Sequence, residues 1–302
     1  MDKIAFVFAG QGAQYVGMGK ELYDQSDAAR SIMDTAERIR PGTLAQCFNG
    51  PEDALKTTLN TQPCVMMLDC ACAAAVVEAG ITPKCVAGFS LGEVAAAAFS
   101  HVMTFEQAFH MVIKRAELMQ SCAERHPGSM GAILRLTTEQ VQALCASVDQ
   151  AYPVNYNCLG QTVVACANET FEPLQALVQG QRGRMMKLNV SGAFHSPWMK
   201  EASDNLHDYL STLTLNTPFL PLYANATAQP YESDIAGLLS QQVSSPVLWQ
   251  KTIENMVAQG VDTFVEVGPG TTLGGLIRKI VTAKVLNVQD AKSLDETIKE
   301  LS

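Results

Sequence analysis

The pentapeptide Gly-Phe-Ser-Leu-Gly at residues 88–92 most constrains the fold of this 302-residue chain. It lies between an apolar run at residues 85–87 and a strongly helix-forming run at residues 91–99. Glycine on both sides of the serine lets the backbone turn sharply from a strand into a helix. That turn places the Ser90 hydroxyl outside the sheet and directs helix N–H groups at whatever the hydroxyl attacks. The pattern is typical of the nucleophile elbow of serine acyl-transfer enzymes, although an ordinary Gly-Ser-Gly turn can share it.

Strands and helices are expected to alternate on both sides of this elbow. Residues 4–9 form a continuous apolar run, as in a strand buried on both faces of a parallel sheet. A helix is expected at residues 61–79, capped by Thr61 and with Pro63 in its first turn. A strand at residues 263–267 and a following helix at about 273–280 complete the pattern. The alternation predicts an α/β domain with a mostly parallel sheet.

The middle of the chain has a different pattern, which begins after the break His-Pro-Gly at residues 126–128. The expected order is β-α-β-β-α-β, with strands at 131–136, 154–156, 162–167 and 184–190 and helices at 138–148 and 170–179. This order is typical of a small ferredoxin-like unit. We therefore expect an inserted subdomain at residues 123–190, and a large domain built from residues 1–122 and 191–302.

Composition excludes several classes of protein. Hydrophobic residues make up 47% of the chain and charged residues 17%, enough apolar material for a large core. No apolar run is expected to reach the length that spans a bilayer, and the N-terminal apolar run ends in a loop rather than a signal cleavage site. The net charge of −9 argues against a nucleic-acid partner. Nine scattered cysteines without a CxxC pair favour a reduced, cytoplasmic protein with buried thiols over disulfides or a metal site.

A serine nucleophile needs a base, and five histidines are available. His195 is the best candidate because it follows the last expected strand of the insert, where the chain returns to the large domain. The other four lie in ordinary helical stretches or in a polar turn. A structural histidine with satisfied hydrogen bonds remains the alternative for His195.

Acyl transfer also needs N–H donors for the oxyanion that develops on the attacked carbonyl. The N–H of Leu91 is one candidate, since it directly follows the nucleophile. The loop at residues 10–14, Gly-Gln-Gly-Ala-Gln, follows the first strand and can supply another donor. A phosphate cradle is the alternative for this loop, but the third glycine and the lysine of nucleotide-binding loops are missing.

Arg115 lies on a mostly apolar helix that begins with a capping box formed by Thr104 and Gln107. An arginine in such a place extends its head group to water or pairs with a buried carboxylate. Alternatively, it binds a substrate carboxylate through two N–H groups. The residues alone leave both possibilities open.

These motifs occur in one order along nearly the whole chain, and together they resemble the malonyl-CoA:acyl carrier protein transacylases. The resemblance rests on residues 10–14, Thr61-Gln62-Pro63, residues 88–93, Arg115, residues 154–161, residues 192–196 and residues 266–270. It implies an α/β-hydrolase-like large domain with an inserted ferredoxin-like subdomain, in agreement with the pattern above.

The resemblance also implies a role for each matching residue. It implies that Ser90 is the nucleophile and His195 its base, in a dyad without a carboxylate. The backbone N–H groups of Gln11 and Leu91 would form the oxyanion hole, and Arg115 would bind the malonyl carboxylate. The backbone carbonyl of Gln242 would orient the histidine, with the neighbouring Gln241 as the alternative. Gln62, Asn155 and Asn157 are expected near the pocket, and neither a metal nor a redox cofactor is expected.

Two phenylalanines bear on selectivity. The family usually has histidine where this chain has Phe89, directly before the nucleophile. The change puts in doubt the hydrogen bonding under the elbow, and activity is expected to survive it. Phe194, next to the base, resembles the bulky residue of malonyl-selective relatives and should crowd an α-methyl group.

The implied function is transfer of a malonyl group from malonyl-CoA to an acyl carrier protein for fatty-acid synthesis, by a cytoplasmic monomer. A carrier protein is typically acidic, so docking needs a local basic patch, for which Arg182, Arg184, Lys187 and Lys200 are candidates. A plain solvated face is the alternative for these side chains. Three rival functions remain: an acyl-thioester hydrolase, a transferase serving a polyketide synthase or malonate decarboxylase, and a non-catalytic carrier-binding protein.

Overall fold

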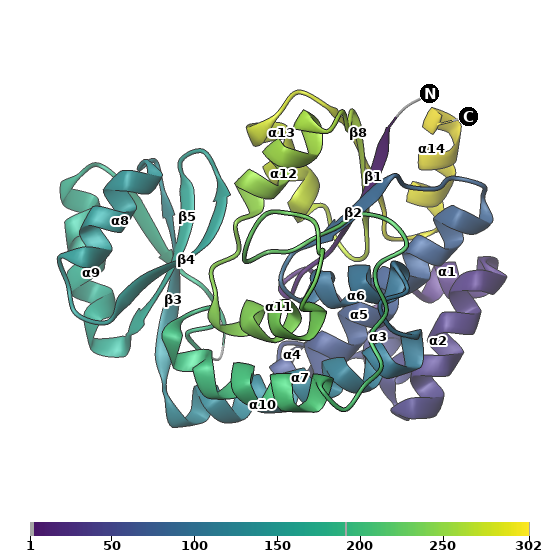
Figure 1. Cartoon of the computed structure of the whole chain (residues 1–302), viewed down its shortest axis with the longest axis horizontal. Helices are drawn as coiled ribbons and strands as arrows, with labels where there is room; N and C mark the ends of the chain where they lie inside the picture. Colours follow the sequence, from purple (N-terminus) through teal and green to yellow (C-terminus); the bar gives the residue numbers. More distant parts are fainter. Residues whose placement is uncertain (1–2, 191, 302) are drawn as a thin grey trace.

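The computed structural model describes residues 3–190 and 192–301. Its larger part is built around a five-stranded parallel sheet with the order β7-β2-β1-β8-β9 (Figure 1). The strands are β1 (Ile4–Phe8), β2 (Cys85–Gly88), β7 (Leu222–Tyr223), β8 (Thr263–Val267) and β9 (Lys284–Val288). Because the strands are parallel, their carboxyl ends meet at one edge, where open α/β sheets bind their ligands.

Helices cover both faces of this sheet. Phe6 and Phe8 of β1 pack in the core that contains α5 and α6, whereas Ala5 and Val7 pack on the opposite side with α12 and α13. The helices of this part are α1 (Lys20–Gln25), α2 (Asp27–Ile39), α3 (Thr43–Asn49), α4 (Glu52–Leu55), α5 (Thr58–Glu78), α6 (Leu91–Phe99), α7 (Phe105–Arg125), α10 (Lys200–Leu210), α11 (Ile235–Gln241), α12 (Trp249–Ala258), α13 (Thr272–Ile280) and α14 (Ala291–Leu301), with the short 3-10 turns η1 (Pro197–Met199) and η2 (Gln242–Ser244).

The insert forms a separate antiparallel sheet, seen on the left in Figure 1. Its elements are β3 (Gly128–Leu134), α8 (Thr138–Ala146), β4 (Ala151–Cys158), β5 (Gln161–Ala167), α9 (Asn168–Gly180) and β6 (Arg184–Lys187). The strand order β4-β5-β3-β6 places the first and third strands in the centre, which is the ferredoxin-like arrangement. One face of this sheet has its own small core, and the other face joins the main core.

Several elements begin or end away from their expected residues. Helix α5 begins at Thr58, so Pro63 lies inside the helix rather than in its first turn. The Thr61 hydroxyl contacts the Leu55 and Thr57 carbonyls, which stabilises the turn before the proline. Strand β3 begins three residues earlier than expected and ends before Arg135, whose φ of 69° breaks the strand.

The strands β4 and β6 also differ from expectation. Strand β4 runs through Pro153 and has two register shifts, of which the one next to Pro153 reflects the N–H that proline lacks for the ladder. Strand β6 ends at Lys187, the last residue that pairs with β3. Helix α7 continues past the expected subdomain boundary at residue 123, and the other boundary, residue 191, lies outside the described residues.

Helix α5 is long and apolar enough to cross a membrane, contrary to the expectation that no segment reaches that length. However, 83% of its most apolar stretch is buried inside the protein. It is therefore the central core helix, and no other helix in the described part of the chain meets the same criteria. The nine cysteines are all free and buried, as expected.

Candidate active site

The Ser90 elbow depends on close backbone contacts that only glycine allows. Strand β2 ends at Gly88, Ser90 has φ 53° and ψ −103°, and α6 begins at Leu91. A Cβ atom at Gly88 would lie 1.9 Å from the Gly92 carbonyl carbon, and one at Gly92 would lie 2.1 Å from the Phe8 carbonyl oxygen. The two glycines thus press the elbow against the end of β1 and hold a serine in a strained backbone conformation.

The structure brings Ser90 and His195 together although 105 residues separate them. The Ser90 Oγ lies 2.8 Å from His195 Nε2. On the other side of the ring, Nδ1 lies 2.9 Å from the Gln242 carbonyl oxygen and 3.2 Å from that of Ser245. Both carbonyls can only accept, so Nδ1 carries the proton and Nε2 accepts from the serine hydroxyl. The ring therefore has the tautomer that a base for Ser90 requires.

Burial, reinforced by the nearby Arg115 cation, lowers the pKa of His195 to about 4. The imidazole is consequently neutral at pH 7 and has an unprotonated Nε2. A serine hydroxyl bonded to a neutral imidazole can transfer its proton as it attacks a carbonyl.

Arg115 is almost completely buried beside the nucleophile, with 1% of its surface exposed. Its Nη1 donates to Gln62 Oε1 at 2.7 Å, and its Nη2 donates to Gln242 Oε1 at 2.8 Å and to Ser90 Oγ at 3.2 Å. Among the described residues, its Nε has no hydrogen-bond partner and no carboxylate forms an ion pair with it. Burial lowers the pKa of Arg115 to about 10, so the guanidinium stays charged at neutral pH.

The Gln242 side chain links this cation to a buried carboxylate. Its Nε2 donates to Glu93 Oε2 at 2.7 Å and to the Ser90 carbonyl oxygen at 2.6 Å. Glu93 also accepts from the Tyr231 hydroxyl and from the backbone N–H of Asn225. Burial raises the pKa of Glu93 to about 7, against the opposing effect of these hydrogen bonds. One amide side chain therefore connects the arginine, the elbow and the carboxylate.

The Asn225 side chain forms hydrogen bonds with the backbone of the elbow. Its Oδ1 accepts from the Ser90 N–H at 2.7 Å, and its Nδ2 donates to the Gly88 carbonyl oxygen at 2.6 Å. These two bonds satisfy the backbone groups on either side of Phe89, and neither bond involves the Phe89 side chain. Asn225 thus supplies hydrogen bonds to the elbow that do not depend on the side chain at position 89.

The loop expected to supply an oxyanion donor lies beside the elbow. A Cβ atom at Gly10 would lie 2.8 Å from the Phe89 carbonyl oxygen, so the chain entering Gln11 runs against the nucleophile turn. The Gln11 side chain lies 3.5 Å from the Thr58 hydroxyl of α5. Leu91 is the first residue of α6, where a backbone N–H has no partner within the helix.

The remaining candidates lie around this centre. The Phe89 ring packs edge-on against Trp249, with ring centroids 5.5 Å apart. Phe194 is buried in the main core next to the histidine. Asn155 pairs with Val247, close in sequence to the carbonyl that contacts His195. The side-chain oxygens of Asn155 and Asn157 are buried and lack hydrogen-bond partners among the described residues.

No group of three or more potential metal ligands occurs in the described ranges 3–190 and 192–301. The Ser90 hydroxyl itself contacts the His195 imidazole and the Arg115 guanidinium.

The sequence model of the acyl transferase domain matches residues 5–302. The chain belongs to this family. It is an acyltransferase, as the sequence motifs predicted. The malonyl CoA-acyl carrier protein transacylase of Bacillus subtilis (strain 168) is 34% identical over 310 residues, which cover 100% of this chain and 98% of the relative. The protein of the same name from Staphylococcus aureus (strain MRSA252) is 35% identical over 312 residues, covering 98% of this chain and 99% of the relative.

Comparison with solved structures gives the same family assignment. A malonyl CoA-acyl carrier protein transacylase from Clostridium perfringens has a TM-score of 0.96 and 36% identity, covering 99% of this chain and 97% of that one. A malonyl-transacylase solved in complex with a type II polyketide acyl-carrier protein has a TM-score of 0.95 and 32% identity, covering 99% of this chain and 100% of that one. The expected fold class is therefore confirmed.

Sequence reasoning missed four residues of this centre: Glu93, Asn225, Tyr231 and Ser245. Glu93 carried a signal, because it is the single charged residue in the otherwise apolar helix α6. The sequence carried no such signal for Asn225 and Tyr231, because their partners lie 132 to 138 residues away along the chain.

Proposed function

We propose that this enzyme transfers a malonyl group from malonyl-CoA to the phosphopantetheine thiol of an acyl carrier protein, through a malonyl-Ser90 intermediate. The relatives named above support this activity, and so does the charge arrangement around the nucleophile. Because one thioester replaces another, the exchange is nearly thermoneutral and calls for neither a metal nor a redox cofactor.

In the first step, His195 Nε2 takes the Ser90 proton as Oγ attacks the thioester carbonyl. The N–H groups of Gln11 and Leu91 stabilise the oxyanion, and the histidine returns its proton to the departing CoA thiolate. In the second step, His195 Nε2 takes the proton of the carrier thiol as its sulfur attacks the malonyl ester, and the histidine then gives that proton to the departing Ser90 Oγ. The Gln242 and Ser245 carbonyls keep the ring oriented throughout both steps.

The observation that carries the proposal is the buried Arg115 beside Ser90. Its Nη groups are bonded to neutral amide oxygens, and its Nε is unpaired among the described residues. An unpaired buried donor costs about 1–3 kcal/mol, which a substrate carboxylate would recover. The Nε and Nη2 groups lie on one side of the guanidinium, and they can bind a carboxylate with two hydrogen bonds when Nη2 exchanges its long contact with Ser90 Oγ for the carboxylate. Since Nη2 lies 3.2 Å from Ser90 Oγ, a short diacid such as malonate fits this spacing.

The amide and aromatic residues would complete recognition. Pantetheine has two amide N–H groups, and the unpaired oxygens of Asn155 and Asn157 are suitable acceptors for such donors. Gln62 fixes the arginine, and Phe194 would crowd an α-methyl group on the acyl chain. The carrier would approach over the insert, where Arg182, Arg184 and Lys187 are candidates, whereas Lys200 already pairs with Asp204.

We place the enzyme in the cytoplasm as a monomer in fatty-acid synthesis. A polyketide carrier is the second candidate partner, because one structural relative was solved with such a carrier.

The deciding experiment is intact-protein mass measurement after mixing with malonyl-CoA, and again after adding phosphopantetheinylated carrier protein. The expected result is one malonyl adduct that moves onto the carrier. In Ser90→Ala the adduct should be absent, and in Arg115→Ala the preference for malonyl over acetyl should be lost. Arg38→Ala, which changes an exposed arginine paired with Glu106, is the matched control. An adduct that decays to free malonate without reaching any carrier would instead indicate a hydrolase.

A further inference from the structure

A cavity of about 880 Å³ lies at the end of the sheet opposite the nucleophile. Thr82 and Pro83, just before the start of β2, form part of its wall. Ala98 and Phe99, at the carboxyl end of α6, form another part. Ser90 lies at the other end of the same helix, about 13 Å away at 1.5 Å per residue. The cavity is thus separate from the dyad.

The cavity has an apolar floor and an open mouth. Cys70, Met103 and Leu220 are buried side chains of the floor, and Ala74 lies on the wall formed by α5. At the mouth, the Phe219 ring is 61% exposed and lies 4.8 Å from the His101 ring. Ligand cavities of about 300–1,000 Å³ with apolar walls and a few polar groups are the usual form of small-molecule sites.

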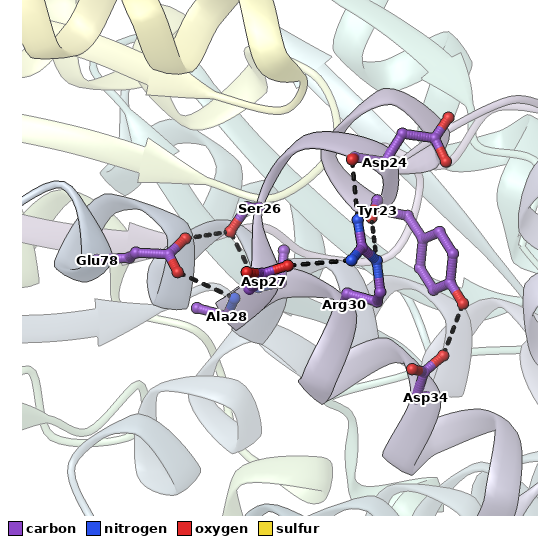
Figure 2. A network of polar contacts seen from close by, with 9 residues as sticks. Tyr23, Asp24, Ser26, Asp27, Ala28, Arg30, Asp34 and Glu78 are labelled. Atoms are coloured by element: carbon purple, nitrogen blue, oxygen red, sulfur yellow. Dashed lines mark hydrogen bonds and ion pairs between the residues drawn. The ribbon is translucent and has the colours of Figure 1, made fainter.

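One carboxylate is fixed at the mouth. Figure 2 shows Glu78 of α5 reaching the start of α2, where its Oε2 accepts from the Ser26 hydroxyl at 2.6 Å and its Oε1 accepts from the Ala28 N–H at 3.3 Å. A carboxylate has about four acceptor positions, so two remain for a ligand. Neither lysine nor arginine occurs among the described residues that line the cavity.

From this arrangement we propose that the cavity binds an amphiphile with an apolar chain and a cationic or N–H-donating head group that pairs with Glu78. The apolar floor takes the chain, and the fixed carboxylate takes the head. An anionic head group would meet Glu78 with no lysine or arginine among the described lining residues to compensate its charge. The ligand therefore differs in charge from the malonyl substrate proposed for the other site.

The test compares three ten-carbon probes by isothermal titration calorimetry below their aggregation limits: decylammonium, decanol and decanoate. Decylammonium should bind with one-to-one stoichiometry and at least fivefold more tightly than decanol, with decanoate the weakest. Glu78→Gln keeps an acceptor for Ser26 and should bring decylammonium within twofold of decanol.

Filling the cavity should weaken the binding of every probe. Ala74→Trp is expected to reduce the affinity for decylammonium and decanol at least tenfold. If Ala74→Trp does not fold, Ala28→Phe, which fills the cavity from α2, is used in its place. Ala176→Trp, on the exposed face of α9 in the insert, is the matched control and should bind like the wild type. Absence of saturable binding, equal affinities in the filled and control variants, or a preference for decanoate would overturn the proposal.

Discussion

Replacing Asn225 with alanine should loosen the nucleophile elbow without removing a contact of the Ser90 or His195 side chains. The asparagine side chain is the partner of the Ser90 N–H at 2.7 Å and of the Gly88 carbonyl at 2.6 Å. Asn225 itself is buried, so alanine would leave both backbone groups unpaired in the interior. Each such group costs about 1–3 kcal/mol, which gives a loss of about 2–6 kcal/mol in the free energy of unfolding.

The same change should slow acylation. Ser90 has φ 53°, a conformation that costs about 1–3 kcal/mol and persists only while its surroundings enforce it. Without Asn225 the turn can relax and move Oγ away from His195 Nε2. A displacement of about 1 Å typically lowers the rate about 100-fold.

Urea unfolding and rapid-quench mass measurement of the malonyl adduct would test both effects. Asn205→Ala is the control, because Asn205 is exposed on α10 and its side chain donates to the Glu201 carbonyl at 2.9 Å, on the surface of the protein. A stability loss below about 1 kcal/mol together with an unchanged rate of adduct formation would refute the reasoning.

Three further predictions follow from the same centre. First, kcat/KM for malonyl-CoA should stay level from pH 8 to pH 5.5 and fall toward pH 4, where His195 becomes protonated; a midpoint near pH 6.5 would show an imidazole of ordinary pKa. Second, the pKa of Glu93 is raised from 4.5 to about 7, so folding disfavours its ionised form and stability is lost as the pH rises through this window. In Glu93→Gln, the loss of unfolding free energy between pH 4.5 and pH 8, measured by urea titration, should be smaller by up to about 3 kcal/mol. An unchanged pH slope would contradict this. Third, Phe89→His should leave the transfer rate within about threefold while lowering stability by about 0.5–1.5 kcal/mol through loss of the contact with Trp249. A larger fall in the transfer rate, measured in a stopped assay, would show that the Phe89 ring contributes to catalysis.

Local chemistry explains what could be predicted about the fold. The glycines around Ser90 and the capping box of Thr104 with Gln107 act within a few residues, and the structure shows both features as expected. The start of α5 was predicted wrongly because Pro63 normally marks the first turn of a helix. Here the Thr61 hydroxyl bonds the Leu55 and Thr57 carbonyls and stabilises the turn that precedes the proline, and most of the helix is buried in the core.

The candidate site could be predicted only where a motif marked it. Family motifs located Ser90, His195 and Arg115, and the structure brings them into contact. The choice between Gln241 and Gln242 needed the fold, which places the Gln242 carbonyl against the histidine. No sequence pattern indicated that the Gln242 side chain also bonds Arg115 and Glu93, because those contacts span 127 and 149 residues.

The attachment of His195 has a consequence for how members of this family diversify. The histidine follows the insert in sequence, yet its N–H donates to the Val243 carbonyl at 3.1 Å and its ring to the Gln242 and Ser245 carbonyls. All three belong to the large domain, so the insert does not itself hold the base. A chimaera that exchanges the insert for that of a relative should keep a working dyad, provided that the pairing of Asn155 with Val247 is preserved. Under the proposed docking of the carrier over the insert, such a chimaera would change the choice of carrier while leaving the chemistry of Ser90 and His195 unchanged.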